Sequence, residues 1–207
     1  LSKAKAKAVG IQCVSNLKQL SLAWNLYAVD NNDSVVLNQG AFTVTLDSWV
    51  TGWLDWQRGQ PIGANTNQQY LLDGGLGPYT ARTLGVYRCG ADVVPSLVGL
   101  LNRSVSMNGF VGDYPTATYP GGFAHDRPEY GNKQYRNFKK LGEFIRPGAS
   151  STWVFMDEHP DSINDGLFAV RMPARNFWGT STGYAAWDDV PASYHNGAGG
   201  LSYADGH

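Results

Sequence analysis

The chain has 207 residues, and its 16 Lys and Arg against 17 Asp and Glu give a net charge of −1. This balance removes the electrostatic case for nucleic-acid binding, and it equally excludes a strongly acidic, disordered chain. The low charged fraction of 16% and the 25 glycines are typical of a loop-rich extracellular domain that contains β-structure. No run of eighteen apolar residues is present, so the sequence holds no candidate membrane-spanning helix.

A long helix, with the turn that ends it, is predicted over residues 1–33. Residues 3–8 consist of Ala and Lys, which are both strong helix formers. Apolar or aromatic side chains then recur at spacings of four, three, four and three, which places them on one stripe of an α-helix: Cys13, Leu17, Leu20, Trp24 and Tyr27. Asp and Asn fill residues 30–33 and favour a turn, so we expect the helix to end there with its stripe buried.

Residues 34–207 are predicted to form a globular head. Residues 109–135 are rich in Gly, Pro and Tyr, which predicts a loop-rich insertion. Runs of β-branched and aromatic residues predict an antiparallel sheet, and the helix is expected to pack on one of its faces in an α+β fold with long irregular loops. Strands are predicted over residues 103–108, 151–156 and 166–170, and over the two arms of a hairpin, 192–195 and 201–204.

The helix resembles part of a known protein family. Residues 11–20, followed by Trp24, Tyr27 and Asp30, are similar to the stretch after the hydrophobic stem of certain prepilin-like proteins. These proteins are abundant in planctomycete and verrucomicrobial genomes. The chain departs from them in lacking the apolar N-terminal stem and its cleavage site.

The C-terminal end carries a second part of the resemblance. His195 is followed, after nine intervening residues, by Asp205 and Gly206, as in the C-terminal signature of that family. One departure lies between the two ends, where Gly90 follows Cys89 and the family has Pro. Related motifs are expected at residues 88–92, 104–108 and 156–166.

The resemblance to type IV pilins and type II secretion pseudopilins implies a fold and a role. It implies a pilin-like fold, and a non-catalytic structural subunit of a filament in the cell envelope or outside the cell. The implied partners are other pilin or pseudopilin subunits through the helix, with a polysaccharide or a secreted protein as a further partner. The full-length form would be anchored by a hydrophobic helix that is missing here. Because exported proteins meet an oxidising environment, Cys13 and Cys89 are expected to form a disulfide.

An acidic stretch between two predicted strands is a candidate calcium site. Its oxygen-bearing side chains belong to Asp157, Glu158, Asp161, Asn164 and Asp165. Calcium prefers six to eight such oxygen ligands, and some pseudopilins bind calcium in a loop of the head. The spacing is not that of an EF-hand loop, so a solvated turn whose side chains cap backbone groups is the other interpretation.

Three residues near the C-terminus are a candidate zinc site. If the predicted hairpin closes, His195 lies on one strand, while Asp205 and His207 share a face of the neighbouring strand. Two histidines and a carboxylate on one sheet face can bind zinc and leave an open position for water. The alternative is structural, with His195 hydrogen-bonded to Asp205 to fix the register of the hairpin.

Several tryptophans lie in polar surroundings, where they either pack the head or form a surface for a partner or a glycan. They are Trp49, Trp53, Trp56, Trp178 and Trp187. A glycan surface would make the chain an exported carbohydrate-binding or other ligand-binding ectodomain, which is the alternative to a filament subunit. The serines lack a Gly-x-Ser-x-Gly elbow, and no catalytic signature flanks Cys89, so an enzyme is not expected.

Overall fold

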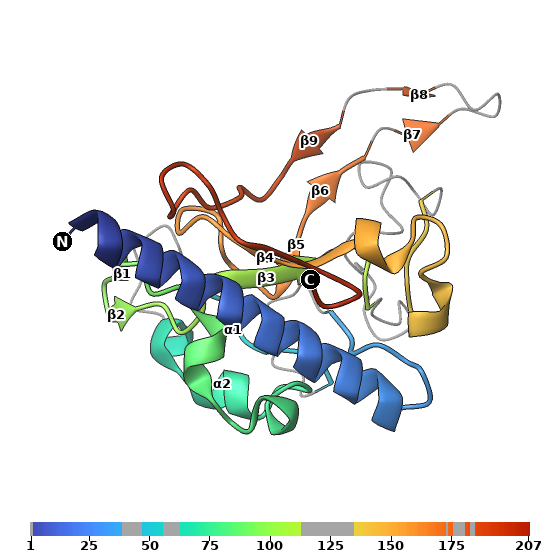
Figure 1. Cartoon of the computed structure of the whole chain (residues 1–207), viewed down its shortest axis with the longest axis horizontal. Helices are drawn as coiled ribbons and strands as arrows, with labels where there is room; N and C mark the ends of the chain where they lie inside the picture. Colours follow the sequence, from blue (N-terminus) through green and yellow to red (C-terminus); the bar gives the residue numbers. More distant parts are fainter. Residues whose placement is uncertain are drawn as a thin grey trace.

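The structure, a computed structural model, describes residues 2–38, 47–55, 63–112, 135–172, 174–175, 181–182 and 185–207. The fold is α+β, with one long helix, α1 (Ser2–Asp30), lying across a small sheet (Figure 1). The N-terminal end of α1 projects beyond the rest of the molecule. Within the described ranges, none of the helices is both long and apolar enough to cross a membrane.

The buried face of α1 is the one that the sequence predicts. Leu17, Leu20 and Trp24 are at most 1% exposed, whereas residues 3–8 are exposed. The helix ends in a turn in which Asn32 and Asp33 adopt positive φ angles of 55° and 67°, a region that these two residue types tolerate well. The predicted helical stripe and its end are therefore both confirmed.

The central sheet has the strand order β10 (Leu201–Tyr203), β4 (Trp153–Asp157), β3 (Val105–Asn108) and β5 (Leu167–Phe168). Strand β4 is antiparallel to both of its neighbours, whereas β5 runs parallel to β3. The sheet is therefore mixed, and the expectation of a purely antiparallel sheet is wrong. Residues 166–170 cannot pair with β4 because β3 and β10 already occupy both of its edges.

The predicted hairpin of residues 192–195 and 201–204 does not form. Leu201 pairs with Met156 of β4, and Pro191 forms a bridge with Glu158, just beyond the same strand. The segments on both sides of residues 192–199 therefore pair with the same edge of β4 and with Glu158, the residue that follows it. Residues 192–199 lie between these segments as a loop. This loop, called the His195 loop below, closes at its tip through a hydrogen bond from His195 N to the Ala198 carbonyl oxygen of 2.9 Å.

Strands β6, β7, β8 and β9 form a ribbon that extends away from the sheet (Figure 1). The elements other than α1 and the central sheet, these four strands included, are all short. They are η1 (Gly63–Thr66), α2 (Gln69–Leu72), η2 (Pro78–Thr80), η3 (Leu84–Tyr87), β1 (Pro95–Ser96), β2 (Gly99–Leu100), η6 (Leu141–Glu143), η7 (Ala149–Ser151), β6 (Val170–Arg171), β7 (Ala174–Arg175), β8 (Ser181–Thr182) and β9 (Ala186–Trp187). Most of the predicted insertion, residues 113–134, lies outside the described residues.

One hydrophobic core joins α1 to the sheet. Trp24 contacts the edge of Phe144 at a ring-centroid distance of 5.7 Å, and Trp49 packs on Phe155 at 5.2 Å. The Ser21 hydroxyl hydrogen-bonds the Ser202 hydroxyl of β10 at 2.8 Å inside this core. The helix is thus held to the head by packing along its whole middle portion.

Two leucines of α1 test which face of the helix is buried. We expect Leu20→Ala to lower the free energy of unfolding by about 3 kcal/mol, because it leaves a cavity in the core. Leu22→Ala should change it by less than about 0.5 kcal/mol, because the Leu22 side chain is 60% exposed. Urea denaturation of both variants measures the difference, and equal losses would contradict the described packing of α1.

Candidate functional site

A disulfide between Cys13 and Cys89 joins α1 to the head, as expected, with a Cα–Cα distance of 5.0 Å. One turn further along α1, the Asn16 amide donates to the carbonyl oxygens of Gly85 and Arg88 at 2.9 and 3.0 Å. The Cys89 N–H in turn donates to the Ser104 hydroxyl at 2.8 Å. The helix is therefore both covalently linked and hydrogen-bonded to the segment that precedes β3.

The His195 loop reaches across to this disulfide. The His195 Nε2 atom lies 3.2 Å from the Cys89 Sγ atom. The base of the loop needs glycine at position 200, since a Cβ there would lie 2.5 Å from a Leu17 methyl group and 2.9 Å from Asp157 Oδ2. The Gly200 N–H donates to the same Asp157 oxygen at 2.9 Å. Close packing on α1 thus directs the loop toward Cys89.

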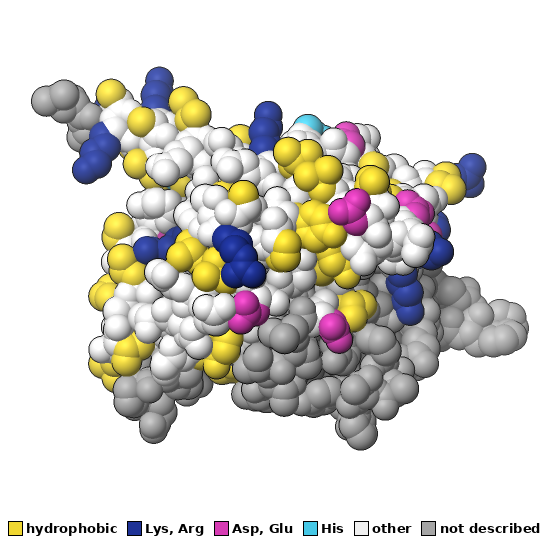
Figure 2. All heavy atoms as spheres, turned by 90° about the horizontal axis from the view of Figure 1, so that it is seen from below, with side chains coloured by type: hydrophobic (Ala, Val, Ile, Leu, Met, Phe, Trp, Pro, Cys, Tyr) yellow, Lys and Arg dark blue, Asp and Glu magenta, His cyan; other side chains and the backbone are white. Residues whose placement is uncertain are grey.

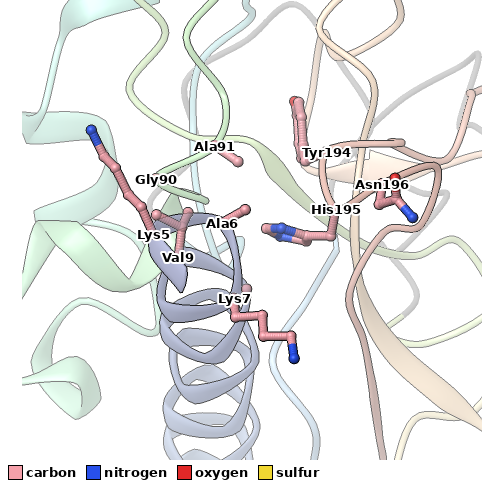
Figure 3. A pocket seen from close by; sticks show the side chains of 10 residues that line it. Lys5, Ala6, Lys7, Val9, Gly90, Ala91, Tyr194, His195 and Asn196 are labelled. Atoms are coloured by element: carbon pink, nitrogen blue, oxygen red, sulfur yellow. The ribbon is translucent and has the colours of Figure 1, made fainter. Parts of the chain in front are cut away.

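An open groove of about 480 Å³ lies between the first turns of α1 and the His195 loop. Figure 3 shows the His195 ring pointing from its loop toward α1, with Lys5 and Lys7 on the helix side. The ligating atoms of Cys13, Cys89 and His195 all lie within 4.8 Å of one another. In the described part of the chain, this is the one group of three or more Cys, His, Asp or Glu residues with such spacing.

The predicted zinc ligands lie in two separate places. His195 contacts Cys89, whereas Asp205 accepts a hydrogen bond of 2.6 Å from His207 Nδ1. The His207 ring also stacks on Tyr203 at a centroid distance of 4.3 Å. Because the hairpin that would have joined these residues does not form, the predicted combination of two histidines and a carboxylate is not assembled.

The predicted calcium ligands do not converge either. Asp157 turns toward Gly200, while the neighbouring Glu158 side chain accepts a hydrogen bond of 2.9 Å from Ser162. Alternation along an extended strand sends these two side chains to opposite faces. Asp165 accepts from Leu167 N at 2.9 Å, the Asn164 side chain accepts from the adjacent Asp165 N, and Asp161 is exposed.

A buried polar cluster lies on the Glu158 side of the sheet, and it joins two predicted calcium ligands, Glu158 and Asp165, to residues that the sequence did not single out. Arg103 is fully buried and donates to the carbonyl oxygens of Val105 and Asn164 at 3.3 and 3.2 Å. Glu158, Asp165 and Asp189 surround it and interact with its charge. The sequence gave no sign that Arg103, the first residue of a predicted strand, is buried, because its partners are far away in the sequence.

Burial changes the acidity of several of these carboxyl groups. It raises the pKa of Asp165 to about 7, although the Leu167 N–H and Arg103 oppose the shift and Asp189 adds to it. Burial also raises the pKa of Asp157 to about 6, against the hydrogen bond from Gly200 and with a contribution from Asp92. These carboxyl groups therefore favour their neutral forms in the folded chain more than in the unfolded chain.

The predicted tryptophan surface is only partly on the outside. Trp49 is fully buried, with its Nε1–H donating to Asn38 and Gly166, and Trp53 is half-buried. Trp187 is 54% exposed and borders a groove of about 360 Å³ that Trp153, Phe110 and Arg136 also line. The other two predicted members, Trp56 and Trp178, lie outside the described residues.

A second apolar face of α1 is exposed, and the sequence interpretation missed it. Its members, called the outer stripe below, are Ile11, Val14, Leu22, Leu26 and Val29. Ile11 and Val29 are 72% and 71% exposed. Figure 2, which views the molecule from below, shows hydrophobic side chains on this side of the molecule, with lysines toward the projecting end of α1. Their spacings of three, four and eight residues were a signal that the sequence offered.

No protein-family model, no curated protein and no solved structure matches the chain.

The buried carboxyl groups predict that stability falls as the pH rises. Near pH 5 the folded chain holds protons on Asp165 and Asp157 that the unfolded chain, with carboxyl pKa values of about 3.9, has released. This stabilisation is complete only below the unfolded pKa of about 3.9, and it is lost progressively as the pH rises from there through the folded pKa values of about 6 and 7. The free energy of unfolding in urea should therefore be higher at pH 5 than at pH 8.

Asp165→Asn isolates the contribution of one group. The amide oxygen can still accept from Leu167 N, but it carries no charge, so the difference between pH 5 and pH 8 should shrink by roughly 2 kcal/mol. The control, Asp73→Asn, changes an exposed carboxylate that accepts a hydrogen bond from the Gln69 amide, a group that does not titrate, and it should leave the difference unaltered. An unchanged pH dependence in Asp165→Asn would show that this carboxyl group keeps its charge in the folded state.

Proposed function

We propose that the chain is a non-catalytic structural subunit of a pilus-like or type II secretion-like filament, with a pilin-like head, in the cell envelope. The observation that carries the proposal is the outer stripe of α1. A monomeric protein gains nothing from five exposed apolar side chains on one face of a helix, whereas exposed apolar surface of this kind is typical of an interaction site. The stripe extends over residues 11–29, about 27 Å at the rise of an α-helix.

The partner that fits this stripe is the same helix of other subunits. The opposite face of α1 is already occupied by the head, so α1 can pack on neighbouring helices without leaving its own core. The stripe keeps to one face of α1, with spacings of three, eight, four and three residues, and a one-sided apolar face suits packing of one helix on another. Lys18 is the exposed charged residue between its two halves, and it can extend its ammonium group past a neighbouring helix.

The disulfide supports placement in the envelope or outside the cell. Disulfides persist in oxidising compartments and are rare in the cytosol. The Cys13–Cys89 bond links the helix to the head, which is the connection that tension or bending along a filament would load. A covalent link at this point therefore suits a subunit whose helix is held by its neighbours and whose head is not.

Substitution on the outer stripe tests the proposal. We expect the chain to self-associate with increasing concentration in sedimentation velocity, and Leu22→Lys combined with Leu26→Lys to abolish that association by placing two charges in the interface. Gln19→Lys, on an exposed neighbouring position of the same helix, is the matched control and should associate like the parent chain. Thermal melting should be similar in all three proteins.

Self-association that persists unchanged in the double variant would exclude the outer stripe as the assembly surface. A parent chain that stays monomeric at every concentration would also count against the proposal, because the helix contact would then lack the strength to build a filament.

A second candidate is a ligand-binding ectodomain, favoured by the groove beside Trp187. Trp153, Phe168 and Trp187 pack edge to face in series, with centroid distances of 5.6 Å for each pair. This packing holds the exposed Trp187 ring in a fixed orientation at the edge of the groove. A fixed, exposed aromatic ring beside polar groups such as Arg136 is suited to stacking on a sugar ring.

Binding of soluble polysaccharides, followed by tryptophan fluorescence, tests this second candidate. Trp187→Ala should weaken binding roughly tenfold, because an aromatic stacking contact contributes about 1 kcal/mol or more. Val190→Ala, on the exposed segment that follows, is the control and should bind like the parent. If no polysaccharide quenches or enhances the fluorescence, this function is excluded for the groove.

A further inference from the structure

We propose that Cys13, Cys89 and His195 form a metal site in the reduced protein, in which two thiolates and one imidazole bind a single Zn²⁺ ion. The proposal rests on the convergence of three segments that are far apart in the sequence: α1, the turn after η3 and the His195 loop. It concerns a state of the chain that is distinct from the disulfide-bonded one, and it does not depend on the role of α1 in assembly.

The distances suit a tetrahedral zinc site. Zinc–sulfur and zinc–nitrogen bonds of about 2.3 and 2.0 Å place tetrahedral ligands about 3.8 Å apart for two sulfurs and about 3.5 Å apart for sulfur and nitrogen. The His195 Nε2 atom already lies 3.2 Å from Cys89 Sγ, and all three ligand atoms lie within 4.8 Å. Breaking the disulfide lets the sulfurs separate from bonding distance to the spacing that zinc requires.

Metal binding by the oxidised chain takes two steps, reduction of the disulfide and then binding of the ion, and atoms and electrons balance in each. A dithiol reductant supplies two electrons and two protons, which cleave the Cys13–Cys89 bond into two thiols, and the reductant leaves as its own disulfide. Each thiol then loses its proton as the thiolate binds the ion, so that Zn²⁺ binding releases two protons. Oxidation by a small-molecule disulfide reverses both steps and expels the metal.

The surroundings suit this metal and leave room for a fourth ligand. Thiolate and imidazole are ligands that select zinc over magnesium or calcium. Both cysteines are 1% exposed, whereas His195 borders the groove of about 480 Å³, so a small fourth ligand can reach the ion from the groove. Two thiolates cancel the charge of Zn²⁺, and Lys5 and Lys7 beside the groove then favour water or a small anion in that position.

Contacts of the nearby backbone hold the His195 ring beside the two cysteines. A side chain at Gly10 would place its Cβ 3.6 Å from His195 Nδ1, so the ring packs closely on α1. The Asn16 amide and the Ser104 hydroxyl hold the α1 and Cys89 segments in place through bonds that do not involve sulfur. These contacts remain after reduction and keep the two cysteines near each other.

Cobalt titration of the reduced chain tests the proposal. We expect the dithiol-reduced protein to bind one equivalent of Co²⁺, with the intense thiolate-to-cobalt charge-transfer band and the visible d–d bands of a tetrahedral site. Excess Zn²⁺ should bleach these bands, and the oxidised protein should show none. Absence of the charge-transfer band in the reduced protein overturns the proposal.

Two histidine variants locate the metal. His195→Gln should weaken Co²⁺ binding by more than about 100-fold, because loss of even an outer partner of a ligand costs 10–100-fold. His207→Gln is the matched control and should bind like the parent, because His207 pairs with Asp205 instead. The reverse result, or equal binding by His195→Gln and the parent, overturns the assignment.

A thermal melt covers the case in which reduction unfolds the chain. Zn²⁺ should then restore a cooperative melt to the reduced parent, because a metal that binds only the folded state stabilises it. His195→Gln should gain much less from the same Zn²⁺ concentration. A reduced parent that gains no stability from Zn²⁺ contradicts the proposal, whether or not it is folded.

Discussion

The attachment of α1 to the head at Cys13 is the constraint on which the arrangement of the molecule depends. The helix has one interior attachment through Trp24 and its neighbours, and a second through the disulfide and Asn16. A helix is stiff over the three turns that separate these points, so two attachments fix its rotation as well as its position. That rotation decides which side chains face outward, and it places Lys5 and Lys7 beside the groove that His195 borders.

The edge of β4 imposes the second constraint. Its outer edge pairs with β10 and, just beyond the strand, with Pro191, and the Ala192 N–H donates to the Asp157 carbonyl oxygen at 2.9 Å, so residues 193–199 extend beyond the sheet edge. The loop they form bends toward α1, and Gly200 allows its base to pack against Leu17. One residue after β4, the chain also places Glu158 in the interior, where Arg103 offsets its charge. Burial raises the pKa of the Glu158 carboxyl well above its ordinary value, and Asp189 adds to this shift, whereas Arg103 and the hydrogen bonds from Ser106 and Ser162 oppose it.

Local signals in the sequence were enough to predict α1 and the four strands of the central sheet, but not how those strands pair. The spacing of Leu17, Leu20 and Trp24 predicts the buried face of α1, and it is confirmed, as are strands β3 and β4. The prediction of a hairpin was wrong although its local pattern, a glycine-rich turn between two short apolar segments, is present. The two flanks of the turn pair with the edge of β4 instead of pairing with each other. Tertiary pairing of this kind is not encoded within ten residues of the turn.

The candidate site, like the fold, could be predicted from the sequence only in part. The disulfide could be predicted because the resemblance implies an exported protein and Cys13 lies on the predicted helix stripe, but the third member of the cluster could not. His195 is about 100 residues from Cys89, and its approach depends on the loop that replaces the hairpin. The residue was singled out from sequence for its possible zinc chemistry, with Asp205 and His207 as partners. The structure instead gives it two sulfur atoms, a change that only the fold could supply.

The link at Cys13 also relates the proposed metal site to the outer stripe. Residues 5–7, 9 and 10 form one side of the groove beside His195, and the stripe begins at Ile11, so the two surfaces use adjacent parts of α1. Opening the disulfide removes the covalent hold nearest to the projecting end of the helix. A metal ion bound by the same two cysteines and His195 would restore that hold without restoring the bond. The orientation of the outer stripe would then be maintained in either state, because both link the same turn of α1 to the same point on the head.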